Sequence, residues 1–313
     1  MEGRLRKPDF DRLVPPRSEP QGLSNLNLYA ATVLIWGSTW LAITFQLGTV
    51  PPAVSVVWRF VLAATMLLAF AKYKHLPLRV GGRDHLWLAL AGLSIFGLNY
   101  VGVYIAEGFL PSGLVALVFS LTTFLNLVFM RMFFGAPITP RAAIGACIGI
   151  AGVALVFWPE VAGFSASGNE LSGLGYALGA TILASLGNMV ATRNHRAGMP
   201  VVQANGWGMV YGALCVALYA SARGDRFVFD WSAPYVVSLL YLVVFGSVLA
   251  FGAYITLLGR IGAGRAGYAS IAIPVVALLL SMMVEHLQWQ LTMITGIALC
   301  LAGNLLVLSR RKA

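Results

Sequence analysis

Charged residues are scarce in this sequence. Asp, Glu, Lys and Arg make up 10% of its 313 residues, whereas about a quarter is usual in a soluble domain. Hydrophobic residues make up 59%, against roughly 45–50% in soluble proteins. So little charge cannot cover a compact protein in water, which disfavours a soluble enzyme. The balance is typical of a polytopic membrane protein, whose apolar exterior is solvated by lipid.

The sequence also lacks the signatures of common enzymes and metal sites. It contains no G-x-S-x-G, no H-E-x-x-H and no Gly-Lys-Ser/Thr phosphate loop. Its three cysteines, Cys147, Cys215 and Cys300, lie far apart and have no metal-ligand spacing. We therefore expect a protein that is not an enzyme and that uses no cofactor or metal ion.

Long apolar runs dominate what remains. A helix crosses a bilayer with about 20 residues, and ten such runs are present. They lie near 28–47, 53–72, 86–106, 112–133, 140–158, 171–192, 200–221, 233–256, 266–284 and 290–308. The sequence therefore predicts an all-α integral membrane protein with ten transmembrane helices. Residues 1–27 are polar and predict a disordered cytoplasmic tail, and 309–313 a basic cytoplasmic end.

Basic residues are distributed unequally between the two ends of this predicted bundle. Apart from Arg59, Arg223 and Arg226, every Lys and Arg falls in the termini or in alternate connections. The positive-inside rule then places both termini in the cytoplasm, in a bacterial inner (plasma) membrane. The net charge of +10 is a topology signal and requires no nucleic acid. The expected partners are the lipid bilayer and a small-molecule substrate; the oligomeric state is left open, and a monomer is compatible.

The two halves of the chain resemble each other at a shift of 149–151 residues. Each unit, 28–158 and 171–308, holds five predicted spans, so the second unit must enter the membrane from the other side. Inverted repeats of this kind are typical of transporters, with the substrate bound between the halves near the midplane. A channel or a membrane-embedded scaffold is the alternative. Matching pairs include Pro51 with Pro200, Trp58 with Trp207, and Phe96 with Phe245.

Five motifs along the chain resemble the drug/metabolite transporter (DMT) superfamily, EamA type. They are LIWGSTW (34–40), WRFVLAA (58–64), GACIGIAGVALV (145–156), SIAIPVVALLLSMMVE (270–285) and GIALCLAGNLLV (296–307). The resemblance covers about residues 28–308, and within the superfamily the chain is most similar to YddG-type aromatic amino acid exporters. It implies two inverted five-helix repeats and an exporter of small amphipathic metabolites.

Polar and aromatic side chains within the spans are the candidates for a substrate cavity. Arg59 lies inside a predicted span, where a charge is costly and often functional. It either binds a substrate carboxylate or makes structural hydrogen bonds. Rings can enclose an apolar substrate while Asn, Ser and Thr fix its polar end. Pro274, in mid-span, is expected to kink its helix as a moving part. The other candidates are Trp36, Trp40, Trp58, Asn99, Tyr100, Tyr104, Ser120, Thr123, Asn126, Asn188, Trp207, Tyr254, Tyr268 and Ser270.

Trp58 and Trp207 occupy equivalent positions in the two repeats. If both rings face the shared axis, they form two apolar walls that close alternately above and below the substrate. The alternative is that both pack on lipid or on neighbouring helices.

Carboxylates are missing from the middle of the predicted spans. Glu107 and Glu285 fall at span ends, where we interpret them as interfacial residues. Because proton coupling needs a group that loads and releases a proton within the membrane, the sequence favours facilitated diffusion or exchange through a central cavity by alternating access. The predicted function is export of small amphipathic metabolites, first aromatic and hydrophobic amino acids. The alternatives are a carrier of drug cations or of nucleotide-sugars and phosphates, and a non-transporting scaffold.

Overall fold

The computed structural model describes residues 23–158, 169–261, 268–287 and 290–308. Most of the predicted tail (1–27) and all of the predicted basic end (309–313) lie outside these ranges. Every regular element in the described part is helical, and none is a strand. In chain order the elements are α1 (Asn25–Thr44), α2 (Pro52–Tyr73), α3 (Gly82–Ala91), η2 (Gly92–Leu98), α4 (Asn99–Glu107), α5 (Ser112–Phe119), α6 (Thr122–Phe134), α7 (Pro140–Val156), α9 (Asn169–Arg196), α10 (Val201–Ala222), α11 (Ala233–Tyr241), η3 (Leu242–Leu249), α12 (Ala250–Ile261), α14 (Ala269–Val284) and α15 (Leu291–Leu308).

Eight helical runs within the described ranges are long and apolar enough to cross a membrane, and two shorter apolar helices, α7 and α14, accompany them. Their bounds agree with the predicted spans to within a few residues. Local signals explain several of these bounds. The Ser24 hydroxyl accepts a hydrogen bond from the Asn27 N–H, and Thr139 does the same for Ala142, so both residues cap a helix start. The chain is therefore an all-α, multi-pass membrane protein.

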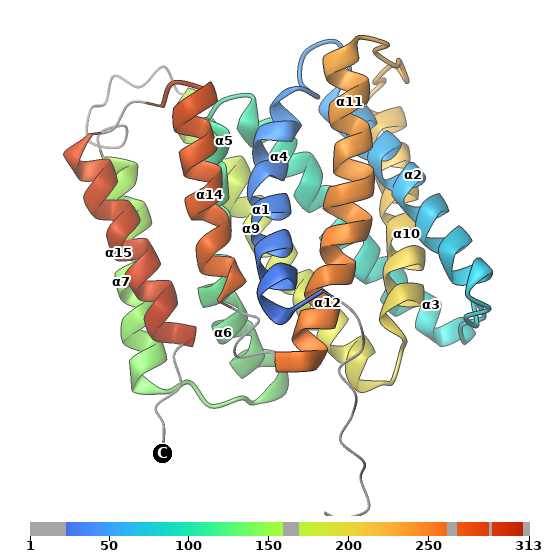
Figure 1. Ribbon diagram of the computed structural model, residues 1–313, viewed down its shortest axis with the longest axis horizontal. Coiled ribbons are helices and arrows are strands. Elements are labelled where there is room, and N and C mark those ends of the chain that lie inside the picture. Colours follow the sequence, from blue (N-terminus) through green and yellow to red (C-terminus); the bar gives the residue numbers. More distant parts are fainter. Residues whose placement is uncertain (1–22, 159–168, 262–267, 288–289, 309–313) are drawn as a thin grey trace, which may run out of the picture.

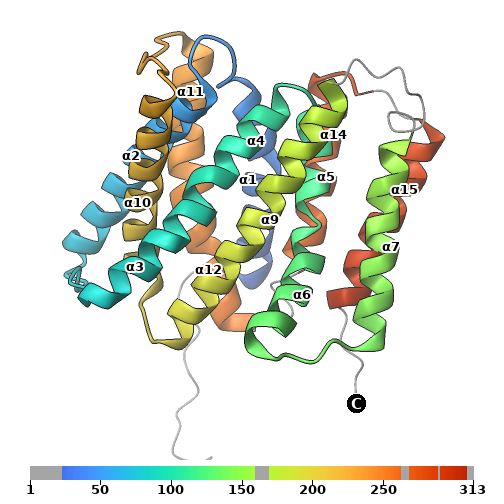
Figure 2. The same cartoon turned by 180° about the vertical axis from the view of Figure 1, so that it is seen from behind.

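The helices stand side by side in a bundle, with connections at its two ends (Figure 1). α7 pairs with α15 at one edge, and α2 pairs with α10 at the opposite edge. Between these pairs, α1 packs on α14 and α12, while α9 packs on α4 and α6, as the reverse view shows (Figure 2). Each of these contacts joins a helix from the first half of the chain to a helix from the second half.

Glycines join α7 to α15 along a seam of direct backbone contact. A Cβ atom on Gly152 would lie 2.6 Å from the carbonyl oxygen of Gly296, and one on Gly303 would lie 2.5 Å from that of Gly145. A side chain at these positions would force the helices apart. The sequence supplies the small residues that such close membrane-helix packing requires.

Two of the spans are interrupted by π-helical segments, η2 between α3 and α4 and η3 between α11 and α12. The sequence repeat aligns these two segments with each other. Gly97 inside η2 has φ −113° and ψ −105°, which is non-helical. π-helical turns are rare and occur frequently at functional sites.

Pro274 lies inside α14 and is buried. The helix continues through it as a single element. The moving part expected at Pro274 stays a prediction.

Candidate functional site

Arg59 on α2 is a buried cation in the interior of the bundle. Its side chain is 2% exposed. The guanidinium carbon lies 4.6 Å from the centre of the Tyr100 ring and 5.3 Å from that of Phe60, which is a cation–π arrangement. Its Nε donates a 3.4 Å hydrogen bond to the Ser247 hydroxyl of η3, while its buried Nη1 has no hydrogen-bond partner among the described residues. The guanidinium therefore keeps donor capacity for a further group.

α4 presents a polar face to this arginine. Tyr100, Tyr104 and Glu107 follow each other at intervals of four and three residues, so they lie on one side of the helix. Tyr104 is 0% and Glu107 is 7% exposed. Within the described part of the chain, both Glu107 carboxylate oxygens lack a hydrogen-bond partner. The Tyr104 hydroxyl lies beside the Arg59 guanidinium, although no bond with good hydrogen-bond geometry joins them. Arg59 acts electrostatically on both side chains.

Glu107 lies at the end of a span as expected, and its side chain is buried between helices. Its position at the membrane interface stays a prediction. Glu285, directly after α14, is half-buried. Its carboxylate accepts hydrogen bonds from the Ser112 backbone N–H at 3.1 Å and from the Ser112 hydroxyl. It thereby caps the N-terminus of α5, where a negative charge is favourable.

Aromatic rings form a continuous cluster beside Arg59. Centroid distances between neighbouring rings run from 4.9 to 6.2 Å. The Trp36 indole N–H also donates to the Gly246 carbonyl of η3 at 3.1 Å, so the π-helical backbone fixes this ring. We call this set the ring cluster, and its members in order of contact are Tyr254, Trp36, Phe251, Phe96, Phe60 and Tyr100.

The structure thus brings five of the predicted residues together, namely Trp36, Arg59, Tyr100, Tyr104 and Tyr254. Sequence reasoning missed Phe60, Phe96 and Phe251, because a Phe in an apolar run carries no mark that separates a site from ordinary core. Asn99 begins α4 and is 3% exposed, and its side-chain oxygen has no partner in the described ranges.

Trp58 and Trp207 lie at opposite ends of the bundle. The Trp58 indole donates to the Val228 carbonyl at 3.1 Å, in the connection between α10 and α11. The Trp207 indole donates to the Leu78 carbonyl at 3.0 Å, in the connection between α2 and α3. Each tryptophan is therefore hydrogen-bonded to a connection in the other half of the chain. We call these two hydrogen bonds the indole latches; the walls proposed for the two rings stay a prediction.

Several other predicted site residues make their contacts away from Arg59 and the ring cluster. The Ser120 hydroxyl lies 3.4 Å from Cys300 Sγ and accepts from Asn304 on α15. The Asn126 side-chain oxygen accepts from Ser185 at 2.7 Å and from Asn188 at 3.4 Å, which joins α6 to α9. Both contacts are helix-to-helix connections. Trp40 packs against Phe119 with centroids 5.3 Å apart, and Thr123, Tyr268 and Ser270 are half-buried.

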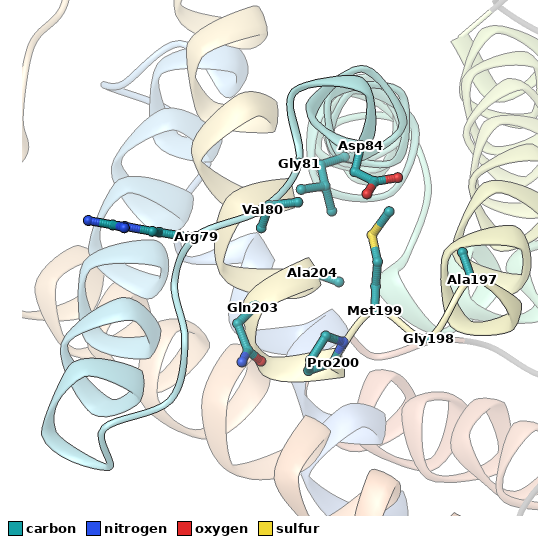
Figure 3. Close-up of a pocket in the computed structure, with 11 residues that line it drawn as sticks. Arg79, Val80, Gly81, Asp84, Ala197, Gly198, Met199, Pro200, Gln203 and Ala204 are labelled. Carbon is teal, nitrogen blue, oxygen red and sulfur yellow. The ribbon is translucent and has the colours of Figure 1, made fainter.

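A cavity of about 220 Å³ opens at one end of the bundle, between the α2–α3 connection and the start of α10 (Figure 3). Asp84, Met199 and Gln203 are among its lining residues. A smaller hollow of about 70 Å³ shares Met199 with it and is lined further in by Phe96 of the ring cluster. The two hollows therefore lie between that end of the bundle and the rings.

Comparison with known proteins agrees with these observations. Residues 26–158 and 171–309 match the EamA-like transporter family. The chain is 25% identical to the uncharacterized transporter YvbV of Bacillus subtilis, over 91% of this chain and 92% of that protein. It is 29% identical to the uncharacterized inner membrane transporter YedA of Escherichia coli, over 80% of this chain and 79% of that protein. It is 25% identical to a probable amino-acid metabolite efflux pump of Escherichia coli, over 79% and 82%. A solved crystal structure with 18% identity superposes with a TM-score of 0.64, over 89% of this chain and 94% of that one, which shows a likeness of fold.

Proposed function

The chain belongs to the EamA-like transporter family, and from this we propose that it exports small amphipathic metabolites across a bacterial inner membrane, first aromatic and hydrophobic amino acids. Its family is one of membrane transporters rather than enzymes. The relative named as a probable amino-acid metabolite efflux pump supports the amino-acid class. The aromatic preference is supported by the ring cluster.

The observation that carries the proposal is the buried Arg59 beside that cluster. A charge inside a membrane protein is costly unless it is paired, yet the described residues give Arg59 Nη1 no hydrogen-bond partner. A substrate carboxylate would accept from this nitrogen. Trp36, Tyr100 and Phe251 would then contact the apolar side chain of the substrate, which is the mixture of ring surface and fixed polar groups that small-molecule sites use.

We further infer two inverted five-span repeats, 28–158 and 171–308, with both termini in the cytoplasm. The aligned π-helical segments and the pairing of α2 with α10 and of α7 with α15 support the repeat. The indole latches support alternating access, since they hold opposite ends of the bundle. Transport is proposed to be facilitated diffusion or exchange, without strict proton coupling.

The alternatives differ in the charges they need. A carrier of nucleotide-sugars or phosphates would require several buried cations, but Arg59 is the only basic side chain that is buried in the described part of the chain. A carrier of drug cations finds specific support in the buried carboxylate of Glu107. A scaffold would leave the donor of Arg59 unexplained.

Flux measurements test the proposal. The full-length protein in liposomes is expected to catalyse saturable counterflow of labelled Phe. Arg59→Gln should reduce the apparent affinity by about tenfold or more, the loss expected for a charge-assisted hydrogen bond, and Arg59→Lys should lose less. Arg223→Gln, at the exposed end of α10, is the matched control and should change nothing. Absence of Phe counterflow together with uptake of a lipophilic cation would contradict the proposal in favour of the drug-cation carrier.

A further inference from the structure

Glu107 is a buried carboxylate that the described protein neither pairs nor solvates. Both of its oxygens lack a donor in the described ranges, and the side chain is 7% exposed. Burying an ionised carboxylate costs several kcal/mol unless a cation or several donors accompany it. The charges that act on Glu107 are Arg59 on α2 and Glu285 after α14. Two carboxylates therefore face one arginine here, so a further cation next to Glu107 would be electrostatically favourable.

The neighbouring carboxylate is already engaged. Glu285 receives the backbone N–H and the hydroxyl of Ser112, so it holds the end of α14 to the start of α5. Glu107 has no such structural duty in the described contacts. The two carboxylates thus differ in role although they lie close enough to interact electrostatically.

Arg59 of α2 contacts α4 at Tyr100, about two helical turns before Glu107, and this separation suits the two opposite charges of one ligand. The Arg59 guanidinium stacks on Tyr100, and Glu107 lies seven residues later, which is about 10 Å along a helix axis. Side chains of a helix lean towards its N-terminus, so the Glu107 side chain extends from its own backbone in the direction of Tyr104. The Tyr104 hydroxyl lies beside the Arg59 guanidinium and interacts electrostatically with Glu107.

We propose that Glu107 receives the α-ammonium group of the substrate while Arg59 receives its carboxylate, so that the carrier selects free zwitterionic amino acids. This inference rests on the proposed function of Arg59 and the ring cluster. A zwitterion neutralises both buried charges at once, whereas an acid or an amine with the same side chain leaves one of them uncompensated. The Tyr104 hydroxyl donates to the substrate carboxylate from the same face of α4.

Three ligands that share one phenyl ring test the selection. Phe carries both charged groups, 3-phenylpropionate lacks the ammonium group, and phenethylamine lacks the carboxylate. Each competes against counterflow of labelled Phe by the full-length protein in liposomes. For the native protein we expect Phe to compete about tenfold or more better than either analogue, as one charge-assisted hydrogen bond predicts.

Glu107→Gln should remove one half of this selectivity. In this variant, the apparent affinities of Phe and 3-phenylpropionate should lie within about twofold of each other. The variant should still bind Phe better than phenethylamine, because Arg59 is intact. Glu285→Gln is the control and should keep the native preference for Phe over 3-phenylpropionate, because its oxygens serve Ser112. Thermal melting of each purified variant checks its fold.

The outcomes separate this inference from the proposed function. Equal competition by Phe and 3-phenylpropionate in the native protein, or a native preference that survives Glu107→Gln, would overturn the role of Glu107 while leaving Phe transport intact. Loss of all flux in Glu107→Gln together with native flux that requires a pH gradient would also overturn it, since Glu107 would then carry a proton. Failure of the native protein to move Phe at all would instead reject the proposed function.

Discussion

Substituting Phe for Trp58 or Trp207 tests whether the indole latches control access to the two ends of the bundle. Phe keeps an aromatic ring and removes the N–H that donates to Val228 at 3.1 Å or to Leu78 at 3.0 Å. Because the two acceptor carbonyls lie in connections at opposite ends, each substitution weakens closure at one end alone. Trp58→Phe should favour opening at the end that holds the α10–α11 connection, and Trp207→Phe at the other.

The size of the effect follows from the bond that is lost. A neutral hydrogen bond contributes a net 0.5–1.5 kcal/mol or so, which is about a two- to twelve-fold change in an equilibrium constant. The two single substitutions should therefore shift the ratio of the open states by this factor in opposite directions. In the double variant the shifts should cancel, so that this ratio returns close to the native value.

Thiol labelling measures these populations. In a background without Cys147, Cys215 and Cys300, Ala53→Cys reports on the start of α2 and Ala204→Cys on the cavity at the start of α10. Trp58→Phe should accelerate labelling at position 53, and Trp207→Phe should accelerate it at position 204. If both substitutions change the two rates in the same direction, or if neither changes any rate, the latches do not govern access and this reasoning is refuted.

Three further predictions concern packing, topology and coupling. Gly152→Ala should lower the free energy of unfolding by about 1–3 kcal/mol through overpacking, which would appear as a lower melting temperature in detergent. Gly175→Ala, where a Cβ meets nothing within 4 Å, is the control and should melt like the native protein. Equal melting temperatures of the two variants would contradict the glycine seam between α7 and α15. Impermeant thiol reagents should reach a cysteine at Lys74 from the cytoplasm and one at Gly224 from outside, and the reverse would invert the proposed orientation. Counterflow of labelled Phe should persist without a pH gradient, and strict dependence on the gradient would reject facilitated transport.

Much of the fold could be predicted because lipid imposes a simple rule on the sequence. A span must be apolar over its whole length, and its connections carry the charge. The bounds of α2 and α10 were therefore close to their predicted values. The contact between α7 and α15 was harder to predict from the sequence, since it depends on which glycines face each other across the bundle.

The site could be predicted only in part. Arg59 and Trp36 are visible in the sequence because a charge or an indole is unusual inside a span. Ser120 and Asn126 are equally visible, but their side chains form hydrogen bonds to other helices. Polarity alone does not distinguish a residue of a candidate binding site from one that joins two helices. The burial of Glu107 was not predicted, because the sequence shows its position along the span but not the direction in which its side chain points.

That direction depends on η2. A π-helical segment places about one extra residue in a helix, and each residue turns an α-helix by roughly 100°. Everything after Leu98 is therefore rotated by about that angle relative to an uninterrupted helix. This rotation about the helix axis turns Tyr100, Tyr104 and Glu107 towards Arg59. The same span with a regular α-helix would carry identical side chains at the same depth and turn them towards different neighbours.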